Sequence, residues 1–433
     1  MQLLLYTPST SARLQYICQF IFKEIMSVDF LITTDPEEFN NRDGLKIKYN
    51  NDPISTEHYT IGNYGLLFET DTREQDTTCF EVNDHKAFFK TEHADFPFDI
   101  LSASFYLLSR YEEYLPHKKD GYGRYAHENA IAFREHFLHL PLINIWIRQL
   151  IRSLQKKFPG FAIHHSPFTF LPTYDIDMAY SYRHKGWMRN IGGFLKSPSL
   201  KRIKVLCGLE EDPFDSYAWL DALHRELNLQ PLYFFLVAKE NGIHDKNILP
   251  HKKVMHTLIK QHAQKYTIGI HPSWQSGDEP ALLQIEKDRL QQMSGTSITK
   301  SRQHYIRFNL PSGYRRLKEI GITDDYSMGY GSINGFRASV ASSFYWFDLS
   351  KNEATLLRIH PFCFMEASSF YEQKYTAEEA YEELMRYYAI CKENGGQLIT
   401  IWHNNFLGTD PTFTAWRDIY RQFILQVRET DRS

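Results

Sequence analysis

FTFLPTYDID, residues 168–177, is the most informative segment of this sequence. Its apolar start is typical of a buried strand, and two carboxylates, Asp175 and Asp177, stand at its end. They point to opposite sides if the strand continues, but they converge if the chain turns just after Tyr174. Two close carboxylates repel each other and therefore favour a cation or a shared proton beside them. An exposed turn is the alternative for any single D-x-D.

Short apolar runs alternate with helical patterns along the rest of the chain after Pro167. The strand candidates are residues 168–175, 231–238, 266–271, 304–310, 321–328, 355–364 and 397–403. Helices are indicated after Ser216 and after Thr376, where Thr376 and Glu379 form a capping box and Gly395-Gly396 a stop. Such alternation predicts a parallel α/β barrel or sheet.

The first part of the chain has a different pattern of predicted strands and helices. It combines strand-like runs with helical patterns over residues 11–25, 98–115 and 142–157, and the last pattern ends at Pro159-Gly160. We therefore expect two domains, a smaller α+β domain over residues 1–165 and an α/β domain over residues 166–433.

Composition excludes several classes of protein. The 433 residues include 49 Lys+Arg and 52 Asp+Glu, a net charge of −3, which argues against nucleic acid or an anionic membrane as the main partner. The five cysteines are an odd number without a C-x-x-C, so neither a disulfide framework nor a thiolate metal site is indicated. No secretory signal and no apolar run long enough to span a membrane is evident, so we expect a cytoplasmic protein. G-x-G-x-x-G, P-loop and G-x-S-x-G motifs are missing.

Polar residues gather at the predicted strand ends, where parallel α/β folds place their chemistry. His271 and His403 each close an apolar run, and neutral imidazole is a good ligand for a divalent metal. His304 begins the predicted strand 304–310, which places it at the wrong end. Arg302 could keep a nearby carboxylate ionised. The alternative for each histidine is an ordinary core residue whose ring is hydrogen-bonded. The alternative for Arg302 is a surface ion pair.

Four rings stand close in sequence to these polar groups and could stack on a sugar, although core packing is the commoner use of such residues. They are Trp274, Tyr326, Tyr330 and Trp402.

In this order, the motifs resemble those of the polysaccharide deacetylase family (NodB homology, carbohydrate esterase family 4). T-Y-D-I-D (173–177) is similar to its first motif, and I-G-I-H (268–271) to its second, in which Gln275 stands in place of a second histidine. The region of the third motif contains Arg302 with Pro311 and Gly313, and the region of the fourth motif contains Asp325-Tyr326-Ser327. The fifth motif is similar to LITIWH (398–403). Residues 1–165 look like an uncharacterised accessory domain that precedes such barrels in some bacterial proteins.

The resemblance implies a deformed (β/α)7-type barrel that holds one divalent metal ion, with Zn²⁺ as the first choice and Co²⁺, Ni²⁺ or Mn²⁺ as alternatives. It implies that Asp177 and His271 are metal ligands, that Asp175 is the general base tethered by Arg302, and that His403 is the general acid. The third ligand is open: His304 could supply it, Gln275 could supply a weaker oxygen, or metal binding could be lost.

Three functions follow as hypotheses. The first is a metal-dependent hydrolase that removes an N-acetyl group from an acetylated sugar or glycan precursor. The second is a non-catalytic glycan-binding or scaffolding protein on a decayed barrel. The third keeps the barrel and the metal but acts on another C–N bond.

Overall fold

A nine-stranded sheet organises the larger part of the chain. The structure, a computed structural model, describes residues 2–160, 167–186, 190–191, 195 and 198–431. The strands follow the order β12-β13-β11-β10-β9-β8-β7-β15-β14. Their bounds are β7 (Phe168–Ile176), β8 (Leu232–Phe235), β9 (Thr267–Ile270), β10 (Lys300–Ser301), β11 (Asp324–Asp325), β12 (Phe344–Asp348), β13 (Glu353–Ile359), β14 (Phe364–Met365) and β15 (Gly396–His403).

All neighbouring strands of this sheet pair in parallel except β12 and β13, which are antiparallel. The parallel α/β expectation is confirmed, but no closed barrel is found: no pairing among the described residues joins the end strands β12 and β14. The antiparallel strand β12, which was not predicted from the sequence, occupies one edge, and the two-residue strand β14 occupies the other.

One predicted strand is wrong. Residues 304–310 do not form a strand; the strand at this place is β10, and a short 3-10 helix spans His304–Ile306. His304 therefore follows the carboxyl end of a strand, on the same edge of the sheet as His271, instead of preceding one.

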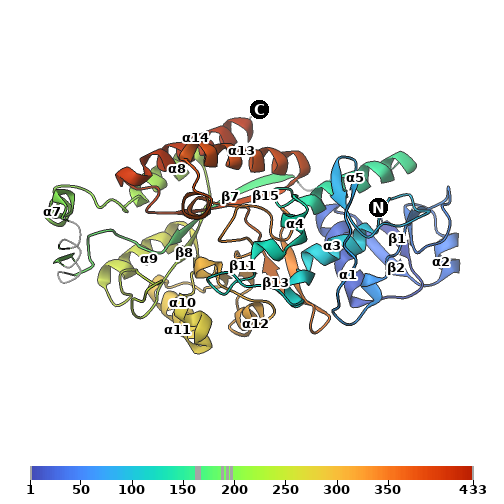
Figure 1. Cartoon of the computed structure of the whole chain (residues 1–433), viewed down its shortest axis with the longest axis horizontal. Helices are drawn as coiled ribbons and strands as arrows, with labels where there is room; N and C mark the ends of the chain where they lie inside the picture. Colours follow the sequence, from blue (N-terminus) through green and yellow to red (C-terminus); the bar gives the residue numbers. More distant parts are fainter. Residues whose placement is uncertain (1, 161–166, 187–189, 192–194, 196–197, 432–433) are drawn as a thin grey trace.

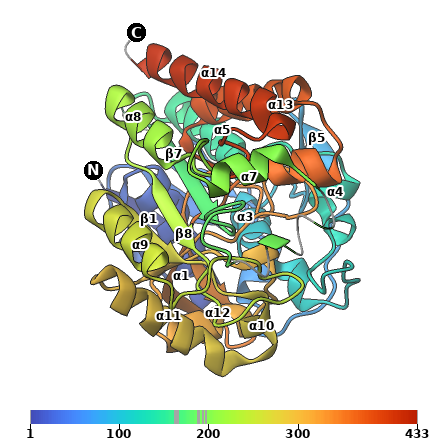
Figure 2. The same ribbon diagram turned by 90° about the vertical axis from the view of Figure 1, so that its left-hand side faces the viewer.

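Helices cover the outside of the sheet (Figures 1 and 2). They are α8 (Tyr217–Leu227), α9 (Lys253–Lys265), α10 (Trp274–Asp278), α11 (Pro280–Ser294), α12 (Ser312–Glu319), α13 (Ala377–Asn394) and α14 (Thr414–Asp431), whereas α7 (Leu200–Leu206) stands apart at the left of Figure 1. The capping box of Thr376 and Glu379 is present at the start of α13, which confirms that prediction. Figure 2 shows α14, α8, α9 and α11 following one another around β7 and β8.

A second sheet, of four strands in the order β2-β1-β3-β4, lies in the N-terminal region (blue in Figure 1). It consists of β1 (Gln2–Tyr6), β2 (Asp29–Thr33), β3 (Lys46–Tyr49) and β4 (Tyr59–Ile61), all parallel. This parallel pairing differs from the α+β arrangement that we expected. It is possible because helix α1 (Ala12–Cys18) and its π-helical continuation (Gln19–Ile25) form a crossover between β1 and β2. An antiparallel pair, β5 (Phe80–Val82) and β6 (His85–Ala87), stands apart from it.

The remaining helices of this region are α2 (Pro36–Asn41), α3 (Ile100–Leu108), α4 (Ile131–Arg134) and α5 (Leu142–Lys157). The helix predicted over residues 142–157 is confirmed, whereas the one predicted over residues 98–115 is too long. Helix α3 ends at Leu108 because Arg110 adopts the left-handed conformation with φ 55°, and a 3-10 helix (Tyr111–Tyr114) follows.

Buried polar contacts fasten the N-terminal region to the large sheet. Arg337, which follows β11, donates from Nη2 to Glu113 Oε2 at 2.6 Å, and Arg110 Nε donates to Glu113 Oε1 at 2.8 Å. All three side chains are at most 2% exposed. Helix α1 also contacts β13.

The expected division at residues 165–166 lies outside the described residues and stays a prediction. Among the described helices, we find none that combines the length and apolar character needed to cross a lipid bilayer.

Candidate metal centre

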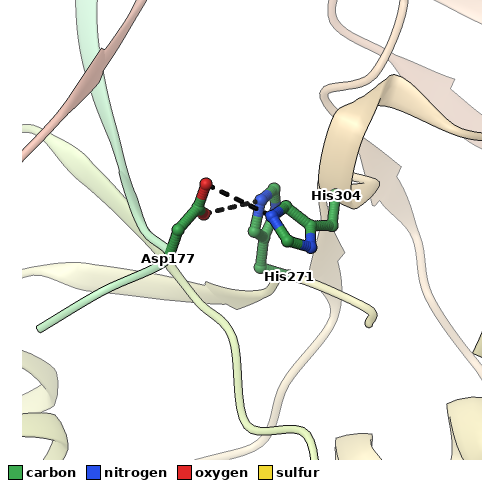
Figure 3. Close-up of side chains that lie close together, drawn as sticks. All are labelled: Asp177, His271 and His304. Atoms are coloured by element: carbon green, nitrogen blue, oxygen red, sulfur yellow. Dashed lines mark ion pairs between the residues drawn. The ribbon is translucent and has the colours of Figure 1, made fainter. Parts of the chain in front are cut away.

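Three side chains converge at the carboxyl edge of the large sheet (Figure 3). His271 Nε2 lies 3.1 Å from Asp177 Oδ1, and His304 Nε2 lies 3.2 Å from Asp177 Oδ2. The three side chains offer ligand atoms that all lie within 4.8 Å of one another. The strands bring them together, because β7 ends one residue before Asp177, β9 one residue before His271, and β10 three residues before His304.

Both imidazole rings are oriented by hydrogen bonds at their other nitrogen. His271 Nδ1 lies 2.6 Å from the carbonyl oxygen of Arg302, and His304 Nδ1 lies 3.0 Å from Asp245 Oδ1. A carbonyl can only accept a hydrogen bond, so Nδ1 of His271 is the donor in this contact, and Nε2 is the ring nitrogen directed at Asp177. This arrangement, with a backbone carbonyl or a carboxylate behind each ring, is the one that orients histidine ligands in metal sites.

These residues fit a divalent metal ion. One carboxylate and two imidazole nitrogens form a ligand set typical of catalytic zinc sites. Asp177 Oδ1 is buried and accepts no hydrogen bond from any residue that the structure describes. Gln275, the other candidate for the third ligand, instead donates from Nε2 to Asp245 Oδ2 at 3.2 Å and lies behind His304.

Asp175 lies beside this cluster on β7 and is held by a buried arginine. Arg302 Nη1 donates to Asp175 Oδ1 at 2.9 Å and to Thr173 Oγ1 at 2.7 Å, and Arg302 Nε donates to the carbonyl of Tyr326 at 3.0 Å. Asp175 Oδ2 lies 3.8 Å from His271 Nε2. The predicted pair of Arg302 and Asp175 is thus brought together, with one carboxylate oxygen facing the histidines.

His403, at the end of β15, also faces Asp177. Its Nε2 is 3.5 Å from Asp177 Oδ2, and its Nδ1 is 2.7 Å from Glu366 Oε1. Glu366 Oε1 also accepts the backbone N–H of His403 at 2.6 Å. The glutamate is fully buried, so it fixes both the ring and the end of the strand.

The charges in this cluster stabilise one another. Burial raises the pKa of Asp177, but the positive charges of His304 and His403 outweigh it and hold this pKa well below its usual range. Burial lowers the pKa of His304, but Asp177 and Asp245 raise it to about 9. In the same way Glu366 and Asp177 raise the pKa of His403 to about 10 against the effect of burial.

A cavity of about 470 Å³ opens above these side chains. Its walls include Asp175, Asp177, His271, His304 and His403, together with rings and polar groups from the surrounding loops. A larger cavity, of about 770 Å³, lies in the N-terminal region, and none of the predicted site residues lines it. The smaller cavity is therefore the candidate active site, and its volume is that of a small-molecule site.

Three of the four predicted sugar-binding rings require a correction, because they are buried and do not line the cavity. Tyr326 is 4% exposed and stacks on His360, and Tyr330 is 3% exposed behind the cavity wall. Trp402 is fully buried, because side chains alternate along β15 and its neighbour His403 faces the cavity. Trp274, half-buried, stacks on His244 beside the cavity.

Several residues of the site were not predicted from the sequence. Asp245 and Glu366, which lie behind His304 and His403, were not identified, and neither were the cavity-lining residues Tyr122, Arg124, Tyr305, Tyr371 and Phe406. Glu366 directly follows β14, so the strand-end criterion could have found it. Asp245 lies in an irregular loop and carries no such signal.

Comparisons with known proteins give two kinds of result. Residues 3–159 match a family of unknown function, DUF7033. A search of curated proteins finds no match.

Solved structures with a likeness to this chain include proteins described as polysaccharide deacetylases. One from Mycobacterium smegmatis is 13% identical, covers 61% of this chain and 84% of its own, and has a TM-score of 0.41. One from Bacillus cereus is 10% identical, covers 59% and 85%, and has a TM-score of 0.31. One from Bordetella bronchiseptica, described as involved in O-antigen biosynthesis, is 10% identical, covers 59% and 90%, and has a TM-score of 0.30. Likenesses with TM-scores below 0.5 establish neither family nor activity, so the function is inferred from the site.

Proposed function

We propose that this chain is a metal-dependent hydrolase that removes the N-acetyl group from an acetylated sugar or glycan precursor. One observation carries the proposal: two carboxylates from the end of β7 and three histidines from three other segments meet in one cavity, and buried groups hold Asp175 and all three histidines. Perturbed, buried titratable groups that converge in a cavity are typical of catalytic sites.

Asp177, His271 and His304 would hold the metal ion. A divalent ion bound there supplies Lewis-acid polarisation of the acyl carbonyl and stabilises negative charge on its oxygen.

Asp175 would be the general base. Its Oδ1 is occupied by the Arg302 guanidinium, so Oδ2 is the oxygen that can take a proton from an attacking water. Because Arg302 is fully buried and bound at three acceptors, it fixes the direction of this carboxylate as a positioning residue.

His403 would be the general acid. Its Nδ1 faces Glu366, and its Nε2 faces Asp177 and the cavity. A proton held at Nε2 can therefore be delivered to the leaving amine of a substrate in the cavity. Glu366 stabilises the imidazolium before transfer.

The test is acetate release from N-acetylglucosamine oligosaccharides by protein loaded with Zn²⁺ or Co²⁺. We expect release by the wild type and a loss of at least about a hundredfold in Asp175→Asn, the lower end of the usual effect of general base catalysis. The matched control is Asp288→Asn, an exposed aspartate on α11. Metal retained with no acetate released by the wild type would refute the N-acetyl assignment, and a panel of other acylated amines would then test the remaining C–N hydrolase hypothesis.

A further inference from the structure

A loop of the N-terminal region, HKKDGYGRY (residues 117–125), reaches the candidate active site. Asp120 Oδ1 accepts the backbone N–H groups of Tyr122 and Arg124, both at 2.9 Å. Gly123 turns the chain with φ 76°. The loop is therefore fixed by its own hydrogen bonds, and it presents the side chains of Tyr122 and Arg124 to the cavity.

Arg124 connects this loop to the segment that follows a proposed metal ligand. Its Nε donates to Asp120 Oδ2 and its Nη1 donates to the carbonyl oxygen of Tyr305, both at 2.6 Å. The side chain is 6% exposed. It passes directly over Gly331, where an added Cβ would overlap Arg124 Nη1, so the opposite wall of the cavity is shaped to accept the guanidinium.

The segment held by Arg124 has an unusual backbone. Tyr305 and Ile306, directly after His304, have φ angles of 57° and 54°. Positive φ is uncommon for residues other than glycine and is an outlier for β-branched isoleucine. Such conformations persist only where the surroundings hold them, and they cluster at functional sites. Arg124 donates its hydrogen bond to the carbonyl oxygen of Tyr305, the first of these two residues.

Tyr122 extends the same contact with its ring. The ring centroid lies 5.5 Å from that of Tyr305 and 6.0 Å from that of Trp274. Tyr122 and Tyr305 both line the cavity that contains His304. One wall of the candidate active site therefore comes from the N-terminal region.

We propose that the N-terminal region is part of the active site. Its loop 117–125 supplies a wall of the cavity, and Arg124 is a positioning residue that holds the Tyr305-Ile306 turn and thereby aims His304 at Asp177. The claim that Arg124 affects metal binding rests on the proposed function. The claim that Arg124 holds the Tyr305-Ile306 turn does not.

The experiment combines hydrogen–deuterium exchange with Zn²⁺ affinity measured against a competing chelator, on the full chain. In Arg124→Ala we expect amide exchange in peptides covering residues 303–308 to rise at least about tenfold, because the local opening is no longer opposed, while peptides from β15 are unchanged. We expect Zn²⁺ affinity to fall by about 10–100-fold, the usual effect of losing a residue that orients a ligand. Arg124→Lys, which keeps a donor, should recover part of both effects.

A second variant approaches the same contact from the other side. Gly331→Ala places a methyl group where the guanidinium lies and 3.3 Å from the Tyr305 carbonyl oxygen, so the Arg124 side chain must shift, whereas the backbone at Gly331 is not left-handed and can accept alanine. We expect the same rise in exchange over residues 303–308. Lys118→Ala, an exposed residue of the same loop, is the control and should match the wild type.

The proposal is overturned if exchange over residues 303–308 is unchanged in Gly331→Ala and in whichever Arg124 variants fold. It is also overturned if exchange rises equally across the whole chain, which would indicate a general stabilising role. A wild type that binds no Zn²⁺ would refute the proposed function, and the exchange data would still decide the role of Arg124.

Discussion

Glu113 forms ion pairs with two buried arginines, Arg110 and Arg337, at the junction between the N-terminal region and the large sheet. Burial raises its pKa, but Arg337 and Arg110 outweigh burial and lower it to about 2 from 4.5. This difference corresponds to roughly 3 kcal/mol of stability at about 1.4 kcal/mol per tenfold change. Removing one partner of a buried ion pair usually costs about 3–5 kcal/mol of stability, which agrees with the value obtained from the pKa of Glu113.

We therefore expect Glu113→Gln to lower the free energy of unfolding by about 3 kcal/mol at pH 7. Urea denaturation followed by tryptophan fluorescence measures it, with exposed Glu226→Gln on α8 as the control. Because the folded pKa lies below the unfolded one, this contribution is complete above about pH 4.5 and is lost as the pH falls toward 2.

The difference between wild type and Glu113→Gln should accordingly shrink in acid. A variant within about 0.5 kcal/mol of the wild type at pH 7, the range of an ordinary surface substitution, would refute this reasoning. A difference that stays constant from pH 7 to pH 3 would refute the electrostatic explanation.

Two further predictions concern the site and its surroundings. Asp245→Asn removes the charge behind His304 Nδ1, so Zn²⁺ affinity should fall about 10–100-fold in chelator competition; an unchanged affinity would exclude Asp245 from orienting the ligand. Trp402→Ala should lower the free energy of unfolding by about 3–5 kcal/mol, because the ring is fully buried, and should leave the metal content unchanged; a stable variant with altered sugar binding would restore Trp402 as a substrate residue.

Local signals in the sequence predicted the regular elements well. The capping box at Thr376 and the stop at Gly395 mark the ends of α13, and the apolar run before Asp175 predicts β7. The alternation of side chains along β15 also implies that Trp402 and His403 face opposite sides, so the burial of Trp402 was predictable from the sequence.

Features set by distant partners were not predictable in this way. Residues 304–310 alternate like a strand, but pairing with β9 and β11 ends β10 at Ser301, and this places His304 in the site. The predicted helix over residues 98–115 breaks at Arg110, whose side chain is directed to a triad with Glu113 and Arg337. Nothing local signals that Arg337 is the partner.

The site shows the same division. Asp175, Asp177, His271 and His403 could be found because each lies at the end of an apolar strand or directly after it. The groups around His304 come from an irregular loop, as with Asp245, or from the N-terminal region, as with Arg124 on the adjacent Tyr305, and only the folded chain brings them near.

The metal content of the purified chain tests the proposed centre directly. After loading with Zn²⁺ and dialysis, elemental analysis should find about one ion per wild-type chain and essentially none in Asp177→Ala or His271→Ala, because each variant removes one of three ligands. Exposed Asp288→Asn should retain the wild-type content. Stoichiometric metal in both ligand variants would contradict the assignment of Asp177, His271 and His304 as the metal site.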